Sequence, residues 1–452
     1  MLNGSLADKI LLYALPLAAT GILQQLFNAA DIAVVGQFAG KEAMAAVGSN
    51  SPLIGLLINL FVGISLGTNV VIATAIGQKK TDIVNKAVHT SILVAIAGGI
   101  FLTVIGEILA APVITLLGVP DDVYSMALLY LRVYLCGMPV ILLYNFEASI
   151  FRSIGNTRMP LLALIAGGVI NVTLNLFFVV ILHMTVNGVA LATVISNFVS
   201  SLILFIKLRH TDAVIRVRKE EFGIDRQTLK RILHIGVPSG LQGMVFSLAN
   251  IIIQSAINSL GTVVMAASSA AFNLEVFAYY VLNSFGQACT TFVGQNHGAG
   301  KEKRCNRTLR ICLCLDALFS AVTCSLILLF AHTLLGVFNS DAEVIQYGTV
   351  RLQYIFLGYV FSLFQEVISG YMRGYGVSLI PAVCTIAGIC GTRVIWIYTV
   401  FRANPTFTVI MQVYPISLAI TALIIAVSAL IYKKKNGSSG VPVGKIRGRN
   451  AR

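Results

Sequence analysis

The feature that most limits the fold of this chain is a series of long apolar runs. Each can cross a lipid bilayer, since about 20 apolar residues span the hydrocarbon core as a helix. The runs lie near 10–37, 50–76, 87–112, 124–148, 160–183, 186–207, 232–258, 268–293, 307–332, 346–370, 380–401 and 408–432. Helices satisfy their own backbone in lipid, whereas a barrel needs short alternating segments. The sequence therefore predicts an all-α membrane protein with twelve transmembrane helices.

The composition excludes a water-soluble protein. Of the residues, 57% are hydrophobic and only 11% are charged, whereas soluble proteins carry about 25% charged residues. The net charge of +14 does not indicate a nucleic-acid partner, because the basic residues form short clusters between apolar runs. The eight cysteines predict no disulfide framework. Cys312 and Cys314 point to different helix faces, so no metal site is expected there.

Lysine and arginine predict the orientation of the chain. With the N-terminus in the cytoplasm, most of the 32 basic residues fall on that side, for example in 79–86, 208–231 and 301–310. The opposite loops carry mainly acidic residues, which are Asp121, Asp122, Asp341 and Glu343. Because cytoplasmic loops are enriched in Lys and Arg, both termini are predicted to be cytoplasmic. The expected location is the inner (plasma) membrane, with lipids as partners of a monomer.

The chain also contains an internal repeat. Pro16, Gly21 and Asn28 correspond to Pro238, Gly243 and Asn250 at a shift of 222, and "FRSIGNTRMP" corresponds to "MRGYGVSLIP" at a shift of 221. Six spans per half, in one orientation, predict two six-helix lobes related by a pseudo-two-fold axis along the membrane normal. The expected parts are an N-terminal lobe (1–207), a basic cytoplasmic linker (208–231), a C-terminal lobe (232–432) and a disordered basic cytoplasmic tail (433–452).

The most informative side chain is an acid within the first apolar run. A charge at the bilayer centre costs about 2.5–3.5 kcal/mol on insertion scales, so such residues usually have a function. Gln24, Asn28 and Asp31 share one helical face, as do Asn171 and Asn175. Together with the hydroxyl of Thr193, the carboxylate and amides are hard ligands that suit Na+ or a proton. The alternative for the amides is that they join helices through hydrogen bonds.

Two polar stripes mark the second lobe. Their members recur at about four-residue intervals and are Ser247, Asn250, Gln254 and Asn258, then Glu275, Tyr279, Asn283 and Gln287. These faces are expected to line a water-filled cavity between the lobes. The alternative for Glu275 is a position at the outer surface, where water simply solvates its carboxylate. Arg393 needs a counter-charge, for which Glu275 is the candidate. The other charged side chains are expected to have structural roles. Arg132 and Arg351 should extend outward from their helices, and Glu147 and Glu366 should pair with loop arginines.

Catalytic motifs are absent from the sequence. It contains no His-Glu-x-x-His run, nucleophile elbow or P-loop, and its six histidines are not clustered. We therefore expect neither an enzyme nor a cofactor. Energy must then come from an ion gradient or from the gradient of the substrate itself. A channel is disfavoured by the two-lobe repeat and the lack of charged rings.

Several motifs together resemble the multidrug and toxic-compound extrusion (MATE) family. They are "LPLAATGILQQLFNAADIAVVGQFAG", "IGQKKTD", "FRSIGNTRMP", "NVTLN", "GVPSGLQG" and "TTFVGQNHGAGK", and the resemblance covers residues 5–432. It implies a twelve-helix antiporter with two lobes around a V-shaped cavity, which exports mostly organic cations in exchange for Na+ or H+.

The resemblance also implies roles for single residues. Asp31 matches the carboxylate that takes the coupling ion, Asn171 and Thr193 match the groups around it, and Pro16 matches a proline at which helix bending accompanies ion binding. Many bacterial relatives carry Asp where this chain has Asn175, which leaves the identity of the ion open. The acidic residue that some relatives carry in their seventh helix is missing, and Gln254 lies nearby.

The sequence therefore predicts a cation-coupled exporter of amphipathic, mostly cationic drugs or toxic metabolites. The expected substrate cavity contains aromatic and amide residues, which are Gln24, Asn28, Tyr134, Asn145, Phe246, Asn250, Gln254, Glu275, Tyr279 and Asn283. The main alternative is a lipid-linked saccharide flippase of a related two-lobe family. Such flippases place several basic residues in the cavity, for which this chain offers only Arg393, Arg132 and Arg351.

Overall fold

The computed structural model describes residues 1–211 and 213–437. The first half comprises α1 (Ala7–Phe38), α2 (Lys41–Gly77), α3 (Thr81–Leu116), α4 (Asp121–Cys136), α5 (Met138–Ser153), α6 (Arg158–Leu176) with its π-helical end η1 (Phe177–Ile181), and α7 (Val186–Arg209). A short 3-10 turn, η2 (Lys219–Glu221), follows. The second half comprises α8 (Arg226–Asn258), α9 (Thr262–Gly298), α10 (Glu302–Leu329), α11 (Ala331–Gly336), α12 (Ala342–Gly374), α13 (Leu379–Thr385), η3 (Ile386–Gly391), α14 (Thr392–Trp396), η4 (Ile397–Phe401) and α15 (Phe407–Gly437).

The predicted number of spans is confirmed. Within the described ranges, eleven helices are long and apolar enough to cross a membrane, and α4 with α5 forms the twelfth as a pair bent by 49°. The bend lies at Gly137, directly before Met138 and Pro139. Proline has no backbone N–H and disfavours helical backbone in the residue before it, so a break at this point is expected.

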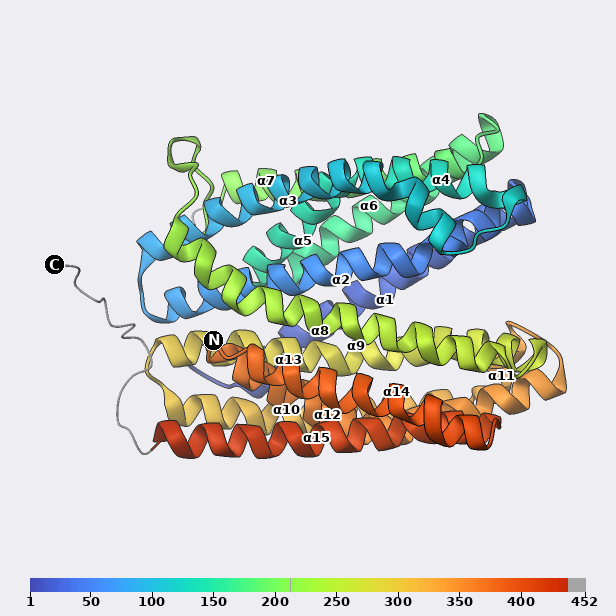
Figure 1. The fold of residues 1–452 in the computed structure, drawn as a ribbon. Coiled ribbons are helices and arrows are strands. Elements are labelled where there is room, and N and C mark those ends of the chain that lie inside the picture. Colours follow the sequence, from blue (N-terminus) through green and yellow to red (C-terminus); the bar gives the residue numbers. More distant parts are fainter. Residues whose placement is uncertain (212, 438–452) are drawn as a thin grey trace.

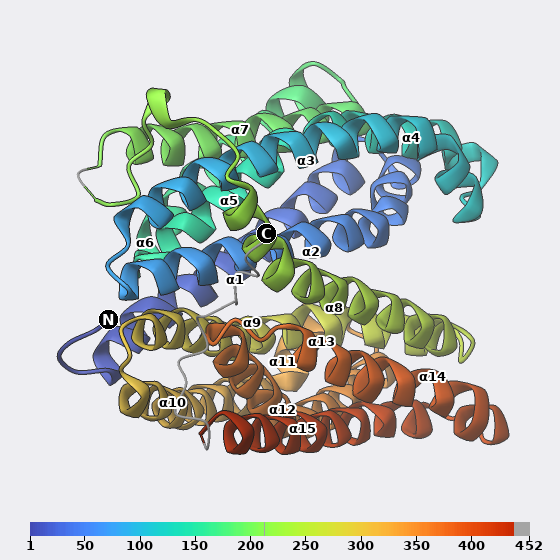
Figure 2. The same ribbon diagram turned by 60° about the vertical axis from the view of Figure 1, so that its left-hand side comes forward.

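The helices form two lobes, as the sequence predicts. Figure 1 shows α1–α7 in the upper lobe and α8–α15 in the lower lobe, and Figure 2 shows the same separation from another side. The described part of the chain contains no β-strand, which confirms the all-α prediction. The N-terminus and residues 213–225 lie at the same end of the bundle, which we call the linker end. The α4 and α11 segments lie at the far end.

The lobes meet through glycine near the linker end. A Cβ atom on Gly63 of α2 would lie 2.2 Å from the Cα atom of Gly240 of α8, and one on Gly67 would lie 2.2 Å from the carbonyl oxygen of Ile232. Small residues let helix backbones approach this closely. At these glycines, the contact between α2 and α8 is therefore made by backbone atoms and has no room for side chains.

This contact makes a specific stability prediction. Gly63→Ala should lower the free energy of unfolding by about 1–3 kcal/mol, because the new methyl group meets backbone that cannot move aside locally. The matched control is Gly55→Ala on the same helix, where a Cβ atom would have nothing within 4 Å. The check is the thermal unfolding midpoint of both variants in detergent. Equal midpoints for the two variants would contradict the close approach.

Helix α1 packs against both lobes. Tyr13 and Ile10 share a hydrophobic core with Phe285 and Phe292 of the second lobe. The Tyr13 hydroxyl lies 2.8 Å from the Thr291 hydroxyl. The first half of α1 is therefore attached to the opposite lobe, while its second half carries Asp31.

The linker is shorter than predicted and is fastened to the first lobe. Sequence analysis placed it at 208–231, whereas α7 continues to Arg209 and α8 begins at Arg226. The His89 ring nitrogen Nε2 lies 3.0 Å from both the backbone oxygen and nitrogen of Arg218. Asp225 caps α8 by accepting a hydrogen bond from the backbone of Thr228 at 2.8 Å, which holds the pKa of Asp225 below its usual value.

The prediction of a disordered tail from residue 433 is wrong for residues 433–437, because α15 remains helical through Gly437. This boundary is corrected accordingly: the apolar run up to residue 432 ends in a basic last turn that still forms intrahelical hydrogen bonds. The rest of the predicted tail, 438–452, lies outside the described residues.

Candidate ion and substrate sites

The first candidate site surrounds the carboxylate of Asp31. This side chain is 7% exposed. Asn175 of α6 donates from Nδ2 to Asp31 Oδ1 at 2.5 Å, and Thr193 of α7 donates to Oδ2 at 3.2 Å. Asn171 contacts both neighbours: its Oδ1 accepts from Asn175 at 3.3 Å and its Nδ2 donates to Thr193 at 3.4 Å. The four residues predicted to hold the coupling ion thus form one cluster.

Local helix geometry explains this arrangement. Asn171 and Asn175 lie one turn apart and so share a face of α6. Thr193 also donates to the carbonyl oxygen of Val189, which fixes the side chain toward α1. No Lys, Arg or His forms an ion pair with Asp31 in the described ranges. In addition, the Asn175 Oδ1 atom is enclosed and accepts no hydrogen bond. A carboxylate and a free amide oxygen are hard oxygen ligands for a small cation.

The other two residues of the polar face of α1 are more exposed than Asp31. Asn28 is exposed and Gln24 is half-buried. Tyr134 of α4 is buried, and its ring centroid lies 6.1 Å from that of Tyr130. Both phenols lie within electrostatic range of Asp31. The polar face of α1 therefore passes from the accessible Asn28 to the enclosed carboxylate beside aromatic side chains.

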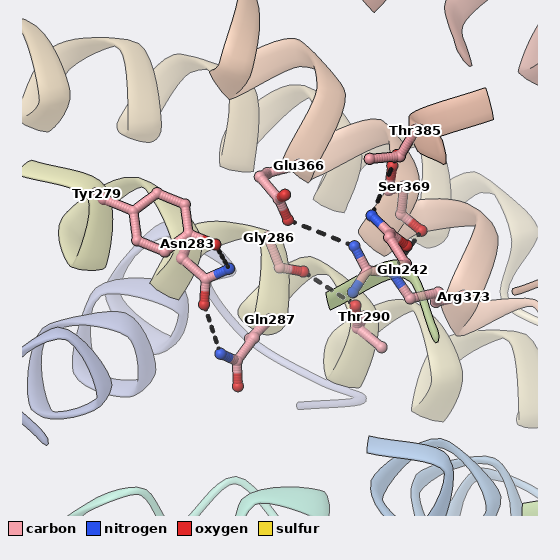
Figure 3. Close-up of polar contacts among 10 residues, drawn as sticks. All are labelled: Gln242, Tyr279, Asn283, Gly286, Gln287, Thr290, Glu366, Ser369, Arg373 and Thr385. Carbon is pink, nitrogen blue, oxygen red and sulfur yellow. Dashed lines mark hydrogen bonds and ion pairs between the residues drawn. The ribbon is translucent and has the colours of Figure 1, made fainter. Parts of the chain in front are cut away.

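In the second lobe, three predicted cavity residues form a chain along α9 (Figure 3). Gln287 donates to Asn283 Oδ1 at 2.6 Å, and Asn283 donates to the Tyr279 hydroxyl at 3.5 Å. All three are half-buried. Glu366 of α12 lies beside them and accepts from Arg373 at 3.4 Å. Glu366 thus has the expected arginine partner, although Arg373 lies in the last turn of α12 and not in a loop.

Other expected partners are wrong. Glu147 pairs with no arginine; its Oε2 accepts from Ser201 at 2.8 Å, while its Oε1 is enclosed without a partner. Arg351 does not extend outward, because it is 3% exposed and binds both oxygens of Glu275, at 2.8 and 3.1 Å. Only Arg132 matches the expectation, as it lies half-exposed 3.6 Å from Glu107.

Arg393 therefore does not pair with Glu275, which corrects the suggested partner. Its Nη1 donates to Asn250 Oδ1 at 2.7 Å and its Nε to Ser417 at 3.4 Å. The guanidinium also stacks on the ring of Phe246, 5.3 Å from its centroid. Asn250 and Phe246, both predicted cavity residues, are thus brought together with Arg393, whereas Glu275 is held by Arg351.

Three other predicted residues have local contacts only. Asn145 is half-buried and donates to the Ile141 carbonyl at 2.8 Å. Gln254 donates to Asn258 at 2.8 Å. Pro16 lies inside α1, and its carbonyl accepts from Thr20 at 2.8 Å.

Sequence reasoning missed Asp316. This acid lies in α10, is fully buried and accepts from Ser320 at 2.8 Å, while its Oδ2 is enclosed without a partner. Its position inside the apolar run at 307–332 was the available signal. No group of three or more His, Cys, Asp and Glu side chains suited to a metal ion occurs among residues 1–211 and 213–437.

A sequence model of the MatE family matches the chain twice, over residues 16–177 and 238–399. The chain belongs to the MatE family. The two matches start 222 positions apart, which is the shift of the internal repeat. Membership also confirms that the protein is a transporter and not an enzyme.

Curated relatives within the family cover most of the chain. The probable multidrug resistance protein YoeA of Bacillus subtilis is 29% identical, with 94% of each chain covered. The probable multidrug resistance protein NorM of Thermotoga maritima is 26% identical, with 85% of this chain and 83% of the relative covered. A solved structure, described as the outward-facing conformation of a multidrug resistance MATE family transporter, has a TM-score of 0.90 at 23% identity and covers 97% of this chain and 98% of its own. This likeness confirms the fold.

Proposed function

We propose that this MatE family protein is a secondary active exporter that exchanges Na+ or H+ for amphipathic small molecules, mostly cations. The observation that carries the proposal is a buried carboxylate, Asp31, surrounded by amide and hydroxyl groups and free of any cationic partner among the described residues. An acid so placed in a membrane helix takes up a cation or a proton when one reaches it.

The position of α1 suggests how ion binding is coupled to movement. Its first half packs on the second lobe through Tyr13, and its second half carries Asp31 in the first lobe. Pro16 lies between these two residues, one turn after Tyr13, and its missing N–H weakens the helix locally. We propose that the coupling ion enters from outside after the lobes rock, engages Asp31, displaces the substrate and later leaves inward.

Substrate class and location complete the proposal. Relatives of similar length carry names of multidrug resistance proteins, which supports drugs or toxic metabolites as substrates of this chain. Aromatic and amide side chains of both lobes, such as Tyr134 and Tyr279, suit amphipathic cations. We place the linker end and both termini in the cytoplasm, in an inner (plasma) membrane protein that acts as a monomer.

The lipid-linked saccharide flippase remains the second candidate. Arg393 favours it, because it is a buried guanidinium without a carboxylate partner among residues 1–211 and 213–437. Binding a diphosphate calls for several such groups, however, and Arg351 is already neutralised by Glu275. Flipping of a labelled lipid-linked sugar at a rate above that of protein-free vesicles would favour this candidate over the exporter.

Transport in proteoliposomes tests the proposed exchange. An outward-directed substrate flux should appear when either a Na+ or a pH gradient is imposed alone, and the gradient that drives it identifies the ion. The control is vesicles with the same substrate load and no ion gradient. Equal flux under all three conditions would refute cation-coupled export.

A further inference from the structure

Three buried charged side chains of the second lobe form a group with more positive than negative charge. Glu275, Arg351 and Arg393 are each 7% exposed or less and gather near the ring of Tyr414. Arg351 occupies both oxygens of Glu275, at 2.8 and 3.1 Å. Because arginine is not deprotonated in proteins, this group of three has a net charge of about +1. The excess charge is Arg393.

Neutral groups alone hold the guanidinium of Arg393. Asn250 and Ser417 accept its hydrogen bonds at 2.7 and 3.4 Å, and the ring centroids of Tyr414 and Phe246 lie 4.8 and 5.3 Å from its central carbon. In the described part of the chain no acceptor binds its Nη2 atom. That atom is not among the fully enclosed polar atoms without a partner either, although the residue as a whole is only 2% exposed.

The site lies on the side of the second lobe that meets the first. Ser247, between Phe246 and Asn250 on α8, accepts a hydrogen bond from Asn59 of α2 at 3.0 Å. Arg393 itself lies between two π-helical segments, η3 and η4. Such local widening of a helix is frequent at functional sites.

The internal repeat relates this group to the acidic one. Asn171, which contacts Asn175 and Thr193 beside Asp31, lies 222 positions before Arg393, the same shift that separates the two matches to the family model. The position equivalent to Arg393 therefore lies in the Asp31 cluster, although Asp31 itself corresponds to Ile253. The cluster in the first lobe has a carboxylate without a cation, and the group in the second lobe has a guanidinium without an anion.

We propose that Arg393, with Asn250 and Ser417, binds an anionic group of the transported molecule, either a carboxylate or a phosphate. A guanidinium presents paired donors that match both groups, and a buried charge is stable when it is paired. Phe246 and Tyr414 supply faces for an aromatic body next to that group. The inference rests on the proposed export function and extends its substrates from cations to zwitterionic and anionic amphipaths.

A matched pair of dyes tests this site. Rhodamine 110 carries a free carboxylate, and rhodamine 123 is its methyl ester on the same ring system. In detergent, Arg393→Met should weaken rhodamine 110 binding by at least about tenfold and rhodamine 123 binding by less than about twofold, measured by fluorescence polarisation, because only the free carboxylate uses the guanidinium. Arg402→Met removes a positive charge from an exposed position nearby and should change neither affinity.

A second variant and a second ligand guard against loss of folding. Arg393→Lys keeps the charge without the planar fork and should also weaken rhodamine 110 selectively. Inorganic phosphate should raise the unfolding temperature of the wild type and not that of either Arg393 variant. Three results would overturn the proposal. The Arg393 variants could lose affinity for both dyes equally, or the wild type could bind rhodamine 123 but not rhodamine 110. The third is that the wild type neither binds rhodamine 110 nor is stabilised by phosphate.

Two further experiments distinguish a lipid headgroup from a transported substrate as the bound anion, and the anion site from the coupling site. If phosphatidylglycerol but not phosphatidylcholine displaces rhodamine 110 from the wild type, and not from Arg393→Lys, the anion belongs to a lipid headgroup and the substrate assignment is wrong. Asp31→Asn should retain the dye preference in this assay, which uses no gradient. Normal gradient-driven transport by Asp31→Asn would therefore refute the coupling proposal and leave the anion site standing.

Discussion

Replacing Asp31 with Asn is expected to abolish export driven by an imposed Na+ or pH gradient. The amide preserves size and still contacts Asn175 and Thr193, but it carries no charge to attract a cation. A tenfold gradient of one coupled ion is worth about 1.4 kcal/mol, so loss of that ion removes about a tenfold concentration ratio of the substrate. The measurement is steady-state substrate accumulation in energised vesicles.

A matched control separates this effect from the removal of a carboxylate at an unrelated position. Asp122→Asn changes an exposed carboxylate at the start of α4 and should leave accumulation unchanged. The unfolding midpoint of Asp31→Asn should stay level or rise, because a buried charge without a cationic partner is removed. Wild-type accumulation by Asp31→Asn would show that the coupling ion binds elsewhere.

Arg351→Met should destabilise the protein by about 3–5 kcal/mol, since it leaves Glu275 as a buried charge without its partner. Both carboxylate oxygens of Glu275 are bound by this one guanidinium, and the pair is almost fully enclosed. The check is the thermal unfolding midpoint in detergent, which should fall by several degrees or more.

The double variant Glu275→Gln with Arg351→Met is the decisive comparison. It removes both charges together and should recover most of the lost stability, because neutral side chains do not carry the same cost of burial. Arg132→Met breaks the half-exposed pair with Glu107 and should cost no more than about 1 kcal/mol. If the double variant is as unstable as Arg351→Met, loss of packing rather than the unpaired charge explains the effect.

Hydrophobic pattern was enough to predict the architecture. Twelve apolar runs correspond to twelve spans, because a helix in lipid must be apolar over its whole length. The break at Gly137 and the π-helical segments around Arg393 were not predicted, because they depend on packing against neighbouring helices. The end of the linker was also misplaced, since polar residues from Arg226 onward extend α8 beyond the apolar run.

Contacts within one helix were predictable and contacts between helices were not. The four-residue spacing of Asn171 and Asn175 placed them on one face. Their grouping with Asp31 came from the ligand chemistry of the residue types, and the family resemblance supported it for Asn171. No spacing rule links Glu275 on α9 with Arg351 on α12, so the wrong arginine was chosen as its partner. Asp316 was overlooked although Thr308 and Ser320 lie at four-residue multiples from it on the same buried face of α10.

The glycine contact between α2 and α8 has a consequence for how such carriers diversify. Main-chain atoms form this contact, and it requires glycine at Gly63 and Gly240. Substitutions of cavity-lining residues at other positions therefore leave this α2–α8 contact unchanged. Substrate specificity can therefore change through substitutions in the cavity while the glycine contact between the lobes stays the same.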